Sequence, residues 1–92
     1  MRYRWSETKE RELQAKRGVS FLAIEAEIRS GGIVDIIEHP SRPNQRILLL
    51  DRAGYIWAVP FVEEDDEHMF LKTAFPSRKF TRMYGGHDER SV

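Results

Sequence analysis

Hydrophobic residues change their spacing once along this chain, at Gly31 and Gly32. Upstream, Phe21, Ile24 and Ile28 recur at helical intervals, which places the three side chains on one face of a helix. Downstream, apolar residues form short runs and alternations that are typical of strands. The pattern predicts an α+β domain whose helices come first and whose sheet follows.

Two helices are expected before this change. Ser6 is a suitable N-cap for a mostly polar helix from Glu7 to about Lys16, and Gly18 ends that helix. Ser20 caps the second helix, which the Gly31-Gly32 pair stops. Residues 77–84 follow the strands and are long enough for one or two further helical turns.

Four strands are expected after the glycine pair: Ile33 to Glu38, Arg46 to Asp51, Tyr55 to Val62 and Met69 to Phe75. Short connections, including a tight turn at Ala53-Gly54, make neighbouring strands antiparallel. Pro60 lacks a backbone donor, which predicts a bulge or an edge in the third strand. The predicted fold is therefore α+β, with two N-terminal helices packed on a four-stranded antiparallel sheet.

Composition limits the classes of protein that fit. Ninety-two residues suit one domain over residues 1–92, with residues 85–92 expected to form a flexible tail. There is no Cys, and the three His residues lack the spacing of a helical metal site, so we expect no metal and no cofactor. The N-terminus has no signal-peptide pattern and no segment has the length of a membrane span, which predicts a cytoplasmic protein without a membrane partner.

Charge is balanced overall but unevenly placed. Fifteen Lys and Arg residues match fifteen Asp and Glu residues, yet residues 68–87 contain no acid and directly follow the acidic run 63–67. The cations of the acid-free stretch are Lys72, Arg78, Lys79 and Arg82. Such a stretch is either a solvated surface or a binding site for a polyanion, because guanidinium and ammonium groups neutralise phosphates.

RNA cleavage by attack of a neighbouring 2′-hydroxyl needs no metal ion. It needs a cation for the scissile phosphate and groups that move protons. Lys72, Arg78 and Lys79 are candidates for the first role, together with Arg46 if the second and fourth predicted strands flank the third. Tyr84 is a candidate for proton transfer. Lys72 is expected to share a face of its strand with Phe70 and Ala74. Three candidates for the general base remain open: Glu38, His39 and His68.

Two segments resemble the BrnT family. Trp5-Ser6-x-x-Lys9 with Lys16-Arg17-Gly18-Val19-Ser20-Phe21 is similar to the opening of BrnT proteins, which read W-D-x-x-K and then K-H-G-V-x-F. Residues 75–81 (FPSRKFT) resemble the S-A-R-K-A-T segment at the end of that family's sheet. Ser6 replaces the family's Asp, Arg17 its His, and Pro76 a Ser or Ala.

The resemblance implies a toxin of a type II toxin–antitoxin module with a RelE-like fold. Such a toxin is a metal-independent endoribonuclease that cleaves RNA and inhibits translation. A ribbon-helix-helix antitoxin neutralises it and links it indirectly to DNA. Arg78 and Lys79 match the family's basic pair, Arg46 matches an Arg that opens a central strand, and Lys72 approximates a family Arg. Arg82 is expected to bind RNA.

Two other interpretations remain open. The first is a non-catalytic protein-interaction module on the same scaffold, which would bind a partner through an exposed strand edge or the tail. The second is a small RNA-binding domain, although the predicted strands lack the paired aromatic residues of a known RNA-binding sheet.

Overall fold

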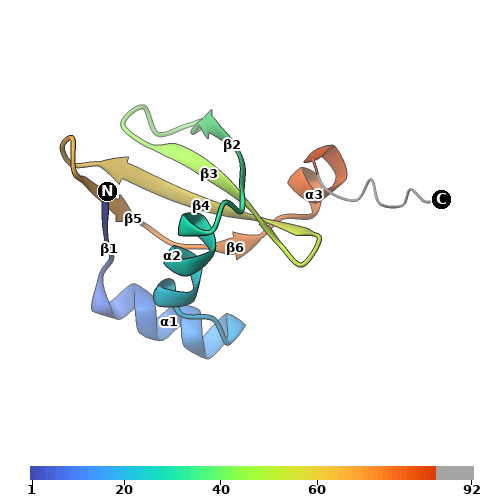
Figure 1. Cartoon of the computed structure of the whole chain (residues 1–92), viewed down its shortest axis with the longest axis horizontal. Coiled ribbons are helices and arrows are strands. Elements are labelled where there is room, and N and C mark those ends of the chain that lie inside the picture. The colour runs from blue at the N-terminus through green and yellow to red at the C-terminus, as the bar shows by residue number, and fades with distance from the viewer. Residues whose placement is uncertain (85–92) are drawn as a thin grey trace.

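A computed structural model describes residues 1–84, and the predicted tail at residues 85–92 lies outside the described residues. The helices are α1 (Glu7–Arg17), α2 (Phe21–Arg29) and α3 (Arg78–Tyr84). The strands are β1 (Arg2–Arg4), β2 (Ile33–Glu38), β3 (Arg46–Arg52), β4 (Tyr55–Glu63), β5 (His68–Leu71) and β6 (Phe75–Pro76). Figure 1 shows α1 and α2 on the same side of the sheet, whereas α3 lies near the turn between β3 and β4.

The sequence signals at the ends of the first two helices are confirmed. The Ser6 hydroxyl accepts a hydrogen bond from the Lys9 amide, and the Ser20 hydroxyl accepts one from the Ala23 amide, each at 3.0 Å. These bonds satisfy donors that a helix start leaves unpaired. Gly18 ends α1 in the left-handed region with φ 67°, a conformation that glycine adopts at little cost.

The sheet is larger and more mixed than predicted. Its order is β1-β5-β4-β3-β2, with β6 pairing beside β5 on the same edge of β4. The expected antiparallel pairs β2–β3, β3–β4 and β4–β5 are present, but β1 adds a parallel strand next to β5. The expectation of a four-stranded, purely antiparallel sheet is therefore wrong. Residues 1–5 alternate in a strand-like way, but nothing local shows that a three-residue strand will pair with a segment more than sixty residues away.

The predicted last strand is divided in two. β5 ends at Leu71, β6 begins at Phe75, and the gap lies opposite Pro60 of β4. The Pro60 carbonyl accepts a hydrogen bond from the Lys72 amide at 2.8 Å, but proline has no N–H to return the second bond of the ladder. The predicted bulge or edge in this strand is not present, because β4 pairs with β3 in unbroken register and lies inside the sheet. The interruption falls in the neighbouring strand instead.

Both faces of the sheet are covered. On one face, α1 and α2 bury Leu13, Phe21, Ile24 and Ile28 against inward residues of β3, β4 and β5. On the other face, the aromatic rings of α3 pack over a second cluster, whose buried members are Ile47, Leu49, Ile56 and Ala58. The sequence predicted the helix-side core but did not place residues 77–84 on the opposite face. We call the two faces the α1–α2 face and the α3 face.

Candidate functional site

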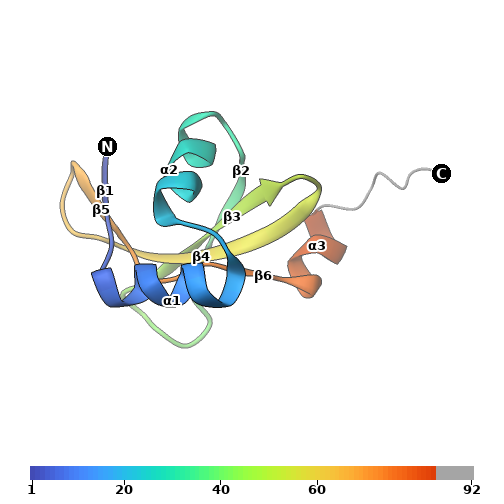
Figure 2. The ribbon, with the colours of Figure 1, turned by 90° about the horizontal axis from the view of Figure 1, so that it is seen from below.

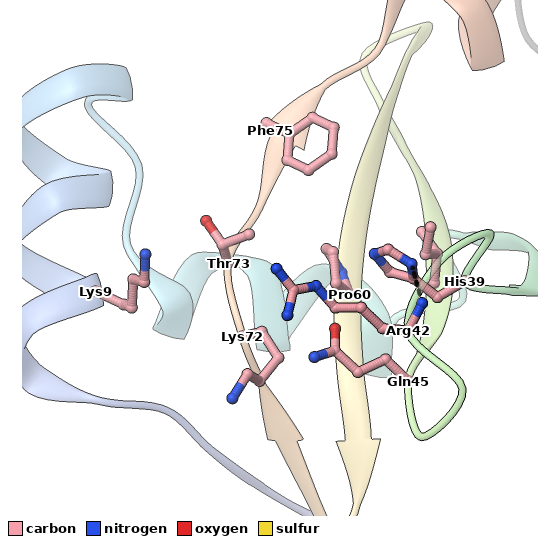
Figure 3. A pocket seen from close by; sticks show the side chains of 9 residues that line it. Lys9, His39, Arg42, Gln45, Pro60, Lys72, Thr73 and Phe75 are labelled. Carbon is pink, nitrogen blue, oxygen red and sulfur yellow. Dashed lines mark hydrogen bonds between the residues drawn. The ribbon is translucent and has the colours of Figure 1, made fainter.

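A cavity of about 420 Å³ opens on the α3 face, beyond the end of the cluster that α3 covers. We call it the basic groove. It draws residues from α1, the loop between β2 and β3, strands β3 and β4, and the segment from Lys72 to Phe75 (Figure 3). Its nine lining residues are Lys9, His39, Arg42, Gln45, Ile47, Pro60, Lys72, Thr73 and Phe75. Three of these are cations and none is Asp or Glu, so the groove favours anions.

Pro60 forms the floor of the groove. Lys72 leaves the ladder opposite Pro60, and the chain then passes through Thr73 before pairing resumes at Phe75. Figure 3 shows Lys9 and Thr73 on one side of Pro60 and the loop with Arg42 and His39 on the other side. The break in the ladder therefore opens the space that the basic groove occupies.

Lys72 and Arg42 are the cations at the floor: the Arg42 side chain reaches from its loop across Pro60, so its guanidinium lies on the side of Thr73 and Lys72 (Figure 3). Within residues 1–84 neither makes an ion pair with a carboxylate. The Lys72 ammonium lies 5.3 Å from the centroid of the Phe70 ring, which confirms that these two side chains share a face. Ala74 does not share it, because the interruption of the strand turns Ala74 into the core of the α1–α2 face. Both cations are thus available to phosphate oxygens.

The cationic surface continues onto α1. An adjoining cavity of about 190 Å³ shares Lys9, Thr73 and Phe75 with the groove and adds Lys16 and Arg17. It also contains Glu12, whose carboxylate lies 3.4 Å from the Lys9 ammonium in an exposed pair. Exposed pairs of this kind are weak and screened by salt. Figure 2 shows α1 running beside the segment that joins β5 to β6, so the basic surface extends around this edge of the sheet.

His39 has a defined tautomer. Its Nδ1 accepts hydrogen bonds from the backbone amides of Ser41 and Arg42, at 3.2 and 3.1 Å. An acceptor nitrogen carries no proton, so the neutral ring is protonated at Nε2. Figure 3 shows the other ring nitrogen facing the groove. His39 therefore presents its Nε2–H as a donor to a ligand in the groove, while the lone pair of Nδ1 accepts the loop amides of Ser41 and Arg42.

The other two candidates for the general base lie elsewhere. Glu38 is exposed and pairs across the sheet with Arg46, on the α1–α2 face. His68 lies beside the acidic turn, where its Nδ1 is 2.9 Å from Asp65 Oδ1. That contact, helped by backbone amides and offset by burial, lowers the pKa of Asp65. Of the three candidates, only His39 lines the basic groove.

Arg46 does not join Lys72, although β3 and β5 do flank β4 as the sequence prediction required. Arg46 pairs with Phe61, and directly opposed residues of antiparallel strands point to the same face. The Arg46 guanidinium lies 5.5 Å from the Phe61 centroid and 3.1 Å from a Glu63 oxygen. It therefore lies on the α1–α2 face, opposite the groove.

The cations of α3 form a separate group. Ser77, which precedes Arg78, donates its amide to the Ile56 carbonyl, whereas Lys72 bonds to Pro60. Four residues along β4 correspond to about 13 Å. Arg78, Lys79 and Arg82 thus lie beyond the groove toward the β3–β4 turn, and none of them lines it. Their predicted roles in binding or cleaving RNA stay predictions.

Tyr84 anchors α3. Its ring packs with Phe80 on the α3 face, and its hydroxyl donates a hydrogen bond of 2.8 Å to Asp35 of β2. This bond, followed by burial and the charge of the carboxylate, raises the pKa of Tyr84. The position accounts for Tyr84 as a structural residue, and its predicted catalytic role stays a prediction.

Sequence reasoning missed Lys9, Arg42, Gln45 and Phe75 as site residues. They come from three segments that only the tertiary fold brings together: α1, the loop between β2 and β3, and β6. One signal was present: residues 39–46 (HPSRPNQR) form a second acid-free stretch with two arginines and a histidine. Phe75 was assigned to a strand, where an aromatic residue is ordinary.

Two further properties concern residues 1–84. They contain no cluster of three or more His, Cys, Asp or Glu side chains that is arranged for a metal ion. None of the helices in this part of the chain has the length and hydrophobicity required to cross a lipid bilayer.

Comparison with known proteins gives one informative similarity. No known family profile and no curated protein sequence matches this chain. Among solved structures, the crystal structure of the Brucella abortus ribonuclease toxin BrnT is similar, with a TM-score of 0.63. The similarity covers 84% of this chain and 96% of that one, at 20% sequence identity. This chain therefore has a BrnT-like fold, as the resemblance implied.

Proposed function

We propose that this chain is the toxin of a type II toxin–antitoxin module and acts in the cytoplasm as a metal-independent endoribonuclease that inhibits translation. The observation that carries the proposal is the basic groove, which combines three cations with a histidine and has no acid in its lining. The BrnT-like fold supports the proposal, because the similar Brucella protein is a ribonuclease toxin.

The groove suits cleavage by the neighbouring 2′-hydroxyl. In this reaction the 2′-oxygen attacks phosphorus, the bond to the 5′-oxygen breaks, and the products are a 2′,3′-cyclic phosphate and a 5′-hydroxyl. Lys72 and Arg42 hold the scissile phosphate and stabilise the negative charge that develops on its oxygens. His39 donates a hydrogen bond from Nε2 to the phosphate group, while solvent takes the 2′ proton and supplies a proton to the leaving 5′-oxygen.

Arg78, Lys79 and Arg82 belong to the same proposal as a second contact for RNA. They lie further along the α3 face, about 13 Å from the groove as measured along β4. Cationic side chains at such positions bind the phosphate backbone of RNA without regard to its base sequence. The RNA thus follows the α3 face from the groove toward the β3–β4 turn.

A ribbon-helix-helix antitoxin is the partner that this proposal requires, with DNA contacted through the antitoxin. The edge strand β2 is the surface that favours a protein partner. Within residues 1–84 it pairs only with β3, and it exposes Ile33, Val34 and Ile36, with Val34 44% exposed. An exposed edge with apolar side chains can accept a strand from another chain. The same edge is the observation that favours the alternative, a non-catalytic interaction module.

Cleavage of a single-stranded RNA by the purified chain tests the function. We expect cleavage to persist in EDTA, with cyclic phosphate ends, and to fall at least about a hundredfold in Lys72→Ala, as for loss of a transition-state charge contact. Arg11→Ala is the matched control: Arg11 is an exposed cation of α1, paired with Glu7 at 3.3 Å and absent from the groove.

Expression of the chain alone in bacteria supplies the cellular readout. The proposal predicts growth arrest, relief by the Lys72→Ala change, and relief by a co-expressed antitoxin. Normal growth with abundant folded protein, together with no RNA cleavage in solution, would favour the interaction module instead.

A further inference from the structure

We infer that the basic groove takes single-stranded RNA, with one unstacked base lying on the ring of Phe75. The inference rests on the proposed function and names the form of RNA that the site accepts.

Phe75 is placed as a binding residue. It belongs to a two-residue strand that, within residues 1–84, pairs only with β4, and the residue is 36% exposed. The ring lines both the basic groove and the adjoining cavity on α1. A partly exposed aromatic ring at the junction of two cationic hollows offers a flat apolar surface to a ligand.

The cations around Phe75 fix the chemistry of that ligand. Lys72 and Arg42 border the floor of the groove, Lys9 lies across Thr73, and Lys16 and Arg17 continue along α1. Single-stranded RNA has a backbone of regularly spaced phosphates from which bases project. Its phosphates can bind the row of cations while one base stacks on the aromatic ring. Stacking on such a ring does not depend on the base, because every base has a π-face.

Phe75 also excludes a duplex. In an A-form helix the bases are stacked on each other, and the major groove is too narrow for side chains to read. A phenylalanine ring can therefore stack only on a base that is turned out of a helix or lies in a single strand. Gln45 and Thr73 line the same space and supply an amide and a hydroxyl for the edge of that base.

A fluorescent single-stranded RNA with 2′-O-methyl riboses tests the inference in a binding assay. This RNA cannot be cleaved, because the methyl group blocks the attacking 2′-oxygen. We expect Phe75→Ala and Phe75→Leu to weaken binding by about tenfold, since removal of a stacking ring has an effect of this order. Phe75→Trp should retain binding, and base stacking should quench its indole fluorescence. Tyr55→Ala is the control, because Tyr55 is an aromatic residue of β4 that is 39% exposed and lies outside the groove.

The outcomes separate this inference from the proposed function. Equal affinity of the wild type and Phe75→Leu, or equal affinity for the single strand and its duplex, would overturn the base-stacking site even if the chain cleaves RNA. Absence of measurable binding to the single strand would also overturn it. Binding that depends on Phe75 without any cleavage of an unmodified RNA would support the site and refute the ribonuclease function.

Discussion

Pro60 shows how one missing N–H shapes a site. A residue with a donor at this position would bond to the neighbouring segment and continue the ladder between β5 and β6. Proline cannot do so, and the residues from Lys72 to Ala74 leave the sheet geometry. Lys72 lines the hollow on the α3 face beside this interruption.

His39 is the residue whose chemistry can be tested most directly. Asn has a side-chain oxygen near the position of Nδ1, so His39→Asn should still accept the amides of Ser41 and Arg42 while losing the Nε2 donor. We expect thermal stability within about 0.5 kcal/mol of the wild type, as for a surface change, and cleavage reduced at least about tenfold, the effect of losing one such hydrogen bond.

The pH profile of His39→Asn distinguishes a donor from a base. If His39 is a neutral donor, the logarithm of the cleavage rate should change with pH in parallel for variant and wild type. A general base would instead give the wild type a rise through the range in which histidine loses its proton, and this rise would vanish in the variant. That second result would contradict the proposed role.

The turn between β3 and β4 carries backbone strain. Ala53 and Gly54 form a two-residue connection with φ 54° and 89°, the geometry in which Asn-Gly is preferred. An L-residue other than Gly or Asn is disfavoured in this region by about 1 kcal/mol. We expect Ala53→Asn to raise the melting temperature by a few degrees, measured by circular dichroism. Gly54→Ala is the control with the opposite expected sign: it should lower the melting temperature, because Gly54 also has a positive φ.

At the scale of elements, the sequence predicted those helix ends that depend on neighbouring residues. Ser6, Gly18 and Ser20 bound the helices as predicted, because caps depend on residues three or four positions away. The place of β1 in the sheet was missed because its pairing is distant, and the gap after Leu71 was missed because Pro60 lies in another strand. The candidate site has the same dependence on distant contacts. Lys72 was predicted as a site residue, whereas Lys9 and Arg42 come close to it only because the folded chain brings their segments together.

α3 depends on contacts with the sheet, since seven residues are too few for a stable helix alone. Tyr84 and Asp35 provide a testable contact. The raised pKa of Tyr84 means that the protonated phenol favours the folded state. Its stabilisation is fully present below the unfolded pKa of about 10 and is lost as pH rises through the higher folded pKa.

Tyr84→Phe should therefore change the pH dependence of stability. We expect the wild type to exceed the variant in melting temperature at about pH 8, and the difference to shrink at about pH 11, where tyrosines ionise. Tyr55→Phe, at an exposed residue of β4 without a hydrogen-bonded partner within residues 1–84, is the matched control. A difference that stays constant with pH would show that the Asp35 bond does not stabilise α3.

At the scale of the whole molecule, the sheet separates the predicted cations. Lys72 lies in the groove, Arg78 lies further along the same face, and Arg46 lies on the face that α1 and α2 cover. The resemblance of residues 75–81 to BrnT proteins favours Arg78 as the residue at the cleaved phosphate, whereas the proposed function assigns that role to Lys72 of the groove. The two assignments predict different kinetics.

A set of four variants measured under steady-state conditions decides between them. With Lys72 at the scissile phosphate, Lys72→Ala lowers kcat strongly. Arg78→Ala then raises KM alone, and added salt reduces that effect, because exposed charges act through screened attraction. If Arg78 holds the phosphate, Arg78→Ala abolishes cleavage, and Arg78→Lys fails as well because an ammonium cannot replace a bidentate guanidinium contact. Loss of kcat in Arg46→Ala at unchanged stability would contradict both assignments, since it would require RNA to react on the α1–α2 face.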